Sequence, residues 1–160
     1  MTNQPIRAVL SAKDIQNLIT ARPDDSVKTV AELMTGKGVG AVIVSRGGGE
    51  IGGIFTERDV MCRVVAEGRD PAATRVADVM SPNVREVDAE ATVEDVLRLM
   101  VVHGHRHILV KDTAGYGLVS IRDLMQWMIL PDQPIAHEGR VGVIRARTAD
   151  TVGAVKGLHP

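Results

Sequence analysis

The 160-residue sequence is poor in aromatic residues and in cysteine. It holds three aromatic rings, Phe55, Tyr116 and Trp127, and one cysteine, Cys62. A single cysteine excludes an internal disulfide framework and a cysteine-rich zinc site. So few rings argue against a protein that binds single-stranded nucleic acid by stacking its bases. The 19 basic residues are balanced by 20 acidic ones, so the basic surface that duplex nucleic acid requires is missing too.

Long apolar runs are also missing. No segment approaches the roughly 20 apolar residues that a membrane-spanning helix needs. The opening segment, MTNQPIRAVLSAKD, lacks the apolar stretch of a secretory signal peptide. We therefore expect a cytoplasmic protein with neither a membrane nor a nucleic acid as partner. Apolar residues still make up 44% of the chain and charged residues 24%, which predicts a packed globular core.

An internal repeat organises the chain. The segment VKTVAELMTGKGVGAVIV, from Val27, matches VEDVLRLMVVHGHRHILV, from Val93, which lies 66 positions later. Further on, GIFTERDV from Gly53 matches GLVSIRDL from Gly117, which lies 64 positions later. The two offsets differ by two residues, and this difference falls in the turn between the flanking strands, where a deletion is tolerated best. Because the matched positions are the periodic apolar ones, the repeat indicates one structural unit present twice.

Each copy predicts the element order β-α-β-β-α. The first helix of each copy has a hydroxyl N-cap, Ser26 or Thr92, then apolar residues at helical spacing, then a C-cap glycine. The expected strands span 18–21, 41–44 and 51–55, then 84–87, 108–110 and 117–119; the expected second helices span 57–67 and 121–130. Since about 60 residues bury little surface alone, we expect an α/β (α+β) fold, a pseudo-two-fold pair with a cleft between its halves.

The repeats also set the expected boundaries. We place the first repeat at 8–75 and the second at 76–130. Residues 131–160 contain three prolines and show weak periodicity, which predicts a loosely ordered tail. Within it, 141–146 is a candidate for an additional strand.

One motif recurs at equivalent places in both repeats: a strand with a glycine, then a hydroxyl residue, then Asp three positions later. The pairs are Thr56 with Asp59 and Ser120 with Asp123. Helix capping explains such a pair, because the N-cap hydroxyl and the N3 acid bind backbone amides at the helix start. The same geometry suits a nucleotide, since helix N–H groups and an adjacent arginine attract phosphate. A carboxylate there suits the two neighbouring hydroxyls of a ribose.

These repeats, with GIFTERDV, GLVSIRDL, VADVMSPNV and GHRHILV, resemble a tandem pair of cystathionine-β-synthase (CBS) domains, the Bateman module, over about residues 8–130. The resemblance implies a disc-like homodimer of four CBS repeats with adenine nucleotides in its clefts. AMP is the first expectation, and ATP, ADP, NAD(H) or S-adenosylmethionine are alternatives. We expect no obligatory cofactor, and an effector protein, still unidentified, that responds to the bound ligand.

The resemblance also implies roles for individual residues. The motif aspartates hold ribose hydroxyls, the motif hydroxyls approach phosphate, and Arg58 and Arg122 stand beside them. Segments that open the second strand flank base or phosphate, and the ends of the first strands line the base pocket. These further residues are Gly40, Ala41, Val42, Arg106, His107, Ile108, Thr20, Ala21, Glu86 and Val87. Because Gly40-Ala41 corresponds to Arg106-His107, the two clefts should differ in size and charge. The family often has a proline in the second strand, and Ile108-Leu109-Val110 lacks it.

Other features suggest different functions. His103, His105 and His107 alternate in HGHRH and would bind zinc if they shared one face, although Gly104 should end the helix between them. Two alternatives stay open: a metal- or nucleotide-dependent enzyme built on this cluster, and a structural interaction module with empty clefts. Cys62 has no recognisable His or Asp partner, which favours a buried structural thiol. Because no nucleophile with a base can be recognised, we expect a non-catalytic sensor.

Overall fold

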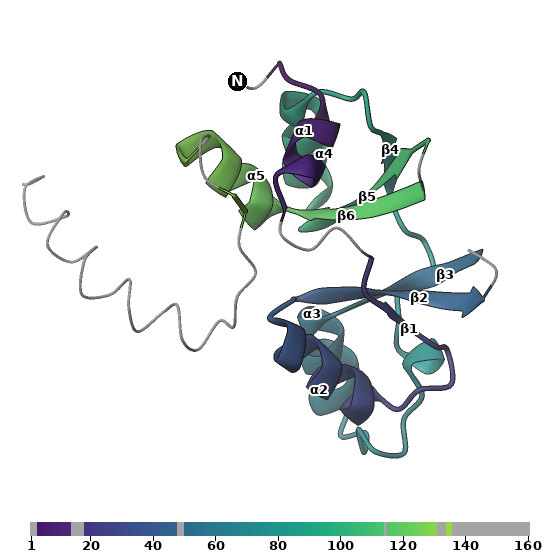
Figure 1. The fold of residues 1–160 in the computed structure, drawn as a ribbon. Helices are drawn as coiled ribbons and strands as arrows, with labels where there is room; N and C mark the ends of the chain where they lie inside the picture. The colour runs from purple at the N-terminus through teal and green to yellow at the C-terminus, as the bar shows by residue number, and fades with distance from the viewer. Residues whose placement is uncertain (1–2, 14–17, 48–49, 114, 131–133, 136–160) are drawn as a thin grey trace, which may run out of the picture.

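Two three-stranded sheets face each other across a seam, and helices cover the outer side of each sheet (Figure 1). The computed structural model describes residues 3–13, 18–47, 50–113, 115–130 and 134–135. The strand orders are β1-β2-β3 and β4-β5-β6. In both sheets the first pair of strands is parallel and the second antiparallel. The predicted mixed fold of two β-α-β-β-α repeats is confirmed.

The first half follows the predicted element order. Its elements are β1 (Thr20–Ala21), α2 (Val27–Lys37), β2 (Ala41–Gly47), β3 (Glu50–Thr56), α3 (Glu57–Asp59) and η1 (Val60–Val65). The Ser26 hydroxyl caps α2 by accepting from the Thr29 amide, as expected. The second helix departs from expectation, because it is α-helical for only three residues and continues as a π-helix. The Ala66 amide reaches the carbonyl five residues back, at 3.0 Å from Met61 O, which widens the helix.

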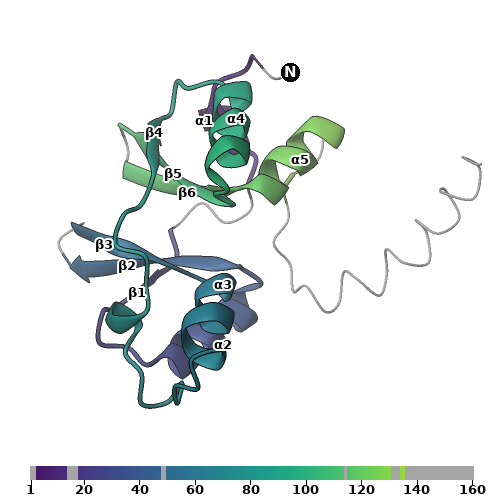
Figure 2. The same cartoon turned by 180° about the vertical axis from the view of Figure 1, so that it is seen from behind.

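The second half has the same order and a regular last helix. Its elements are β4 (Glu86–Asp88), α4 (Val93–His103), β5 (His107–Asp112), β6 (Gly115–Ser120) and α5 (Ile121–Ile129). Thr92 caps α4, and Gly104 ends it in a left-handed conformation. Figure 2 shows the connection between the halves from behind; it includes a short 3₁₀ turn, η2 (Val76–Asp78).

An N-terminal helix that the sequence did not predict, α1 (Ile6–Ser11), packs into the second half. Ile6 and Val9 are fully buried there. The backbone of α1 is also bonded to the second half, since the Ile6 amide donates to Ala91 O at 2.8 Å. Residues 8–11, which the repeat boundaries assign to the first half, therefore contribute to the core of the second.

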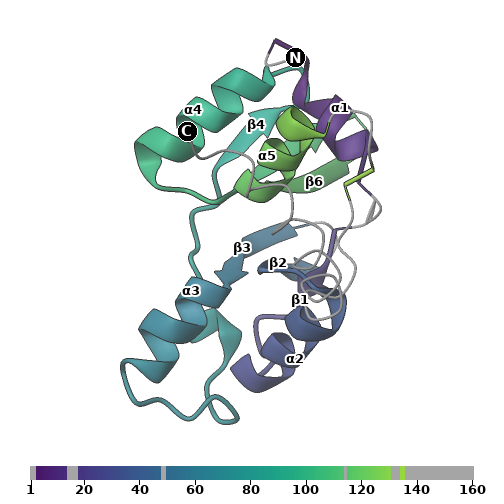
Figure 3. The same cartoon turned by 90° about the vertical axis from the view of Figure 1, so that its left-hand side faces the viewer.

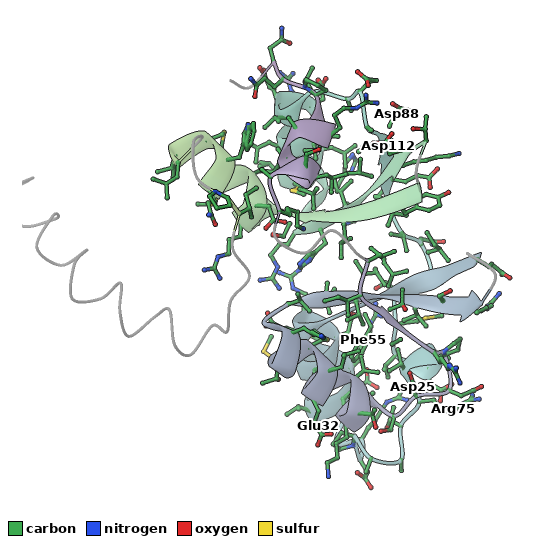
Figure 4. The ribbon with its side chains drawn as sticks, in the orientation of Figure 1. Asp25, Glu32, Phe55, Arg75, Asp88 and Asp112 are labelled. Carbon is green, nitrogen blue, oxygen red and sulfur yellow. The ribbon has the colours of Figure 1, made fainter. Side chains whose placement is uncertain are left out.

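The apolar residues divide into one core per half and a third cluster between the sheets. Along β2, Val42 belongs to the first-half core, together with Phe55 on the same sheet (Figure 4). Its neighbours Ala41 and Ile43 belong to the cluster at the seam, where they meet Leu109 of β5. Because alternate residues of a strand face opposite sides, β2 is buried on both faces. This double burial explains the unbroken apolar run in its sequence.

Little of the segment that follows α5 falls within the described residues. Ile135 is buried against the second-half core, and its amide donates to Ala12 O at 2.8 Å. The candidate strand at 141–146 lies outside the described residues. Within the described part of the chain, no helix has the length and apolar character needed to cross a bilayer.

Candidate functional site

In the first half, the Thr56–Asp59 motif forms a closed capping box. The Asp59 amide donates to Thr56 Oγ1 at 3.3 Å, while Asp59 Oδ2 accepts from the Thr56 amide at 2.8 Å and from its hydroxyl at 2.7 Å. The other carboxylate oxygen, Oδ1, lies 3.2 Å from Arg63 Nη1. Asp59 is only 6% exposed. The protein's own donors therefore occupy both oxygens of this carboxylate.

The Ser120–Asp123 motif in the second half repeats the capping box with a different cation. Asp123 Oδ2 accepts from the Ser120 amide at 2.8 Å, and the Asp123 amide donates to Ser120 Oγ at 3.2 Å. Lys13 Nζ lies 3.0 Å from the same Oδ2 and donates to Leu118 O at 2.5 Å. Asp123 is 3% exposed. The predicted capping geometry is thus present in both halves, with an unforeseen lysine in the second.

Sequence reasoning missed both cations. Arg63 follows Asp59 by four positions, a spacing that places two side chains on one helix face, so it could have been identified. The residue equivalent to Arg63 in the second repeat is Trp127, which carries no charge. Lys13 lies 110 positions from Asp123, and no local pattern connects them.

The residues that open β2 and β5 lie beside these motifs, as expected. In the first half the Glu57 amide donates to Gly40 O at 3.1 Å. The equivalent bond in the second half runs from the Ile121 amide to Arg106 O at 2.9 Å. The sheet register also pairs Ala41 with Thr56 and His107 with Ser120. Each half therefore brings two of the three predicted segments together.

The third segment, the first strand of each half, lies further along the sheet. Thr20 pairs with Ile43, and Glu86 pairs with Leu109. Each partner is two residues beyond the start of its strand, about 7 Å away at 3.3 Å per residue. Four predicted site residues pack with the cores of their own halves, so their side chains serve packing: Ala21, Val42, Val87 and Ile108.

A groove of about 740 Å³ lies between the halves at the opposite end of β3 and β6 from the motifs. It is lined by Glu50, Ile51, Pro82, Asn83, Val84, Arg85, Glu86, Leu109 and Tyr116. Glu86 is the predicted site residue in this lining. Thr56 is six residues beyond Glu50 on β3, or about 20 Å along the strand. The predicted site residues are therefore distributed over two ends of the seam.

Three arginines lie at the end of the seam that holds the two capping motifs. Arg58, Arg106 and Arg122 are exposed, and none of them forms an ion pair with another described residue. Arg58 and Arg122 belong to the first turns of α3 and α5, which begin at the same side of the two halves in Figures 1 and 3. Unpaired guanidinium groups beside helix N-termini favour an anion such as phosphate.

The histidine cluster does not gather into a metal site in the described residues. The rings of His103 and His105 stack with centroids 6.0 Å apart and planes 27° from parallel. His103 ends α4, whereas His107 begins β5. Within the described ranges, no three His, Cys, Asp or Glu side chains are grouped so as to hold a metal ion. The expectation of a buried thiol was wrong, because Cys62 is exposed on η1.

Comparisons with known proteins agree with the repeat structure. The family model of the CBS domain matches residues 12–66 and 76–130. Bacillus subtilis YhcV, a CBS domain-containing protein, is 32% identical over 117 residues, which cover 71% of this chain and 82% of YhcV. The mitochondrial CBS domain-containing protein CBSX3 of Arabidopsis thaliana is 33% identical over 111 residues, 66% of this chain and 54% of CBSX3. An uncharacterised protein of Methanopyrus kandleri is 32% identical, with 58% of its length covered, so the chain spans little more than half of these last two relatives.

Solved structures give the same assignment. A candidate signal-transduction protein with CBS domains from Burkholderia ambifaria superposes with a TM-score of 0.75 at 35% identity, over 82% of this chain and 97% of that one. These relatives are named for their CBS domains, for signal transduction or as uncharacterised, and not for an enzymatic activity. With two matched domains, two β-α-β-β-α units and a capping box at the same place in each, the chain belongs to the CBS-domain family.

Proposed function

We propose that this protein is a non-catalytic sensor that binds an adenine nucleotide between its two CBS domains. AMP is the first candidate, with ATP, ADP, NAD(H) or S-adenosylmethionine as alternatives. Arg106 and Arg122 carry the proposal, because both are exposed beside the start of α5 and neither forms an ion pair with a residue that the structure describes. Their guanidinium groups suit a phosphate group, and they lie beside the positive end of the α5 dipole. The likeness to a candidate signal-transduction protein supports a regulatory role.

The motif aspartates supply the sugar-binding part of the proposal. A ribose presents two adjacent hydroxyl donors, and a carboxylate accepts both. Asp59 and Asp123 are already bonded to Arg63 and Lys13, so a ribose has to exchange with these cations. Binding is therefore coupled to a rearrangement at the helix starts, and such a rearrangement is what an effector protein would detect.

We also propose that two copies of the chain associate through the helices that follow the motifs. Six large apolar side chains are exposed on η1, α4 and α5: Met61, Val65, Val101, Val102, Met125 and Ile129. Val65 and Ile129 are each 70% exposed. Figure 3 shows α4 and α3 at the left of the two halves and α5 next to α4 in the upper half. Exposed apolar side chains favour a partner, and a second copy would cover helices of both domains at once.

Calorimetric titration with AMP, ADP, ATP, NADH and S-adenosylmethionine tests the ligand. Arg106→Ala and Arg122→Ala should weaken phosphate-bearing ligands about tenfold or more, since a charged hydrogen bond is worth roughly 1.5–3 kcal/mol. Arg98→Ala is the matched control, because Arg98 is an exposed arginine on α4 that pairs with Glu94. Mass spectrometry of small molecules released from the native protein on denaturation would identify a retained ligand. Absence of binding across the panel would instead favour the interaction module with empty clefts.

A further inference from the structure

The ion pair between Lys13 and Asp123 is the most enclosed ion pair among the described residues. The Lys13 side chain is 10% exposed and that of Asp123 is 4% exposed, while Arg63 in the first-half pair is 41% exposed. Enclosed charges interact strongly, because little water screens them. Removal of one partner takes the opposite charge away from a buried charged group, which is strongly destabilising.

The two domains obtain their cation from different places. Asp59 is paired by Arg63, four residues later on the same helix. In the second domain Trp127 occupies that position, and its Nε1 is buried without a hydrogen-bond partner among the described residues. The cation comes instead from Lys13, which lies just after α1 at the start of the first CBS domain. The pairing of Asp123 therefore depends on a segment outside its own repeat.

Lys13 also lies where the two terminal segments meet. Its backbone forms a parallel bridge with Ile135, and the Ile135 amide donates to Ala12 O at 2.8 Å. Gln126 Nε2 of α5 donates to Pro134 O at 3.1 Å. Residues 12–13, just after α1, and residues 134–135, beyond α5, are thus held together beside α5. Movement of Lys13 would disturb both of them.

We propose that Lys13 is an internal competitor for the second-domain ligand site. Its ammonium group donates to Asp123 Oδ2, so a ligand whose vicinal hydroxyls use this oxygen has to displace Lys13. Lys13 Nζ anchors residues 12–13 to Leu118 O and to Asp123, so its displacement loosens their backbone contact with residues 134–135, and this loosening reports occupancy of the second domain. The inference rests on the proposed nucleotide binding. Because Arg63 is more exposed, its displacement costs less, and the first-domain site fills at lower ligand concentration.

The competition predicts opposite effects of one substitution on stability and on affinity. Lys13→Met keeps an unbranched apolar stem but removes the ammonium group. The unliganded variant should melt at lower temperature, because Asp123 loses its cation. Bound AMP should then restore donors to the carboxylate, so the AMP-induced rise in melting temperature should exceed that of the wild type. A purely structural ion pair would lower the melting temperature and leave the AMP-induced rise unchanged.

The experiment uses the full chain with Asp59→Asn, which confines ribose recognition to Asp123. AMP is titrated by calorimetry into this background, alone and with Lys13→Met, Lys13→Arg or Arg7→Met. We expect at least about tenfold tighter binding for Lys13→Met and no gain for Lys13→Arg, which keeps a cation. Arg7→Met is the control, because Arg7 lies on α1 but pairs with the exposed Glu90. If Lys13→Met fails to fold, Ile135→Ala serves instead. This variant loosens the contact between Ile135 and residues 12–13 but keeps the Lys13 ammonium group, and it should also tighten AMP binding.

Hydrogen exchange of the Ile135 amide gives a second readout. AMP should speed this exchange in the otherwise wild-type chain, since the bond to Ala12 O weakens once the Lys13 side chain no longer anchors its own segment to Asp123. Equal AMP affinity in all lysine variants, with unchanged Ile135 exchange, would overturn the competition while leaving nucleotide binding intact. If no nucleotide of the panel bound the wild type or Lys13→Met, the proposed function itself would fall, and the competition with it.

Discussion

Gly53 and Gly117 occupy the same position in the two CBS domains, three residues before the capping hydroxyl, but different atoms face them. A Cβ on Gly53 would lie 2.6 Å from the carbonyl oxygen of Ser81 and 2.8 Å from Met80 Sδ. A Cβ on Gly117 would lie 2.6 Å from a methyl carbon of Leu10. Both contacts are too close, but the first involves backbone and the second the end of a flexible side chain.

The backbone contact cannot relax cheaply. Ile54 and Ser81 exchange two hydrogen bonds, each of 2.9 Å, and an alanine at position 53 would push this bridge apart. Overpacking costs about 1–3 kcal/mol, and each weakened hydrogen bond adds about 0.5–1.5 kcal/mol. We expect Gly53→Ala to lower the free energy of unfolding by about 3 kcal/mol. Gly117→Ala should cost only about 1 kcal/mol, because Leu10 can change rotamer.

Thermal unfolding of the two variants beside the wild type measures the difference. For a chain of this size, each kcal/mol lowers the melting temperature by roughly 2–4 °C. Gly53→Ala should therefore lose roughly 6–12 °C and Gly117→Ala roughly 2–4 °C. Urea unfolding at constant slope provides an independent free energy. A larger loss for Gly117→Ala, or equal losses, would show that the Ile54–Ser81 bridge is not a rigid obstacle.

Three further perturbations test other parts of the structure. Met125→Asp places a charge on the exposed face of α5 and should convert the proposed dimer to monomer, as light scattering would show; an unchanged mass would remove α5 from the interface. The hydrogen bond from Arg75 lowers the pKa of Asp78 in the folded protein from its usual value of 3.8. The pair therefore stabilises the fold above pH 3.8, and this stabilisation is lost as the pH falls through the lowered pKa of the folded state. Arg75→Gln, on the surface beside Asp25 (Figure 4), should therefore lower the melting temperature at neutral pH and make little difference in strong acid. Phe55→Ala should cost about 3–5 kcal/mol because Phe55 is fully buried, whereas Tyr116→Ala, at a side chain that is 38% exposed, should cost less than about 1 kcal/mol in urea unfolding.

Features that depend on neighbouring residues were predictable from the sequence. Ser26, Thr92, Thr56 and Ser120 each accept from the backbone amide three residues later, as their positions indicated. Such caps are determined within one turn of chain. The strand order followed from the repeat, although several strands extend beyond the apolar residues that predicted them. Strand pairing continues into polar positions such as Asp112, and a hydropathy pattern does not reveal strand residues that are polar.

Features that depend on distant contacts were not predictable. The helix α1 has six residues and no side-chain cap, so its stability comes from packing on the second half. The π-helical turn at Val60–Val65 has no sequence signal that we recognise. In the candidate site, the position of Arg106 beside the start of α5 followed from the repeat. The pairing of Lys13 with Asp123 could not be predicted, because it depends on where α1 packs.

The placement of α1 has a consequence for synthesis of the protein on the ribosome. The helix is made before the first CBS domain, but its backbone partners Ala89 and Ala91 belong to the second. At about 5–20 residues per second, roughly 4–20 s pass before these partners are translated. During that time the first domain can fold while Ile6 and Val9 lack their core, which leaves an apolar face open to chaperones and to neighbouring nascent chains. Removal of α1 would accordingly damage the second CBS domain, which is translated after the first.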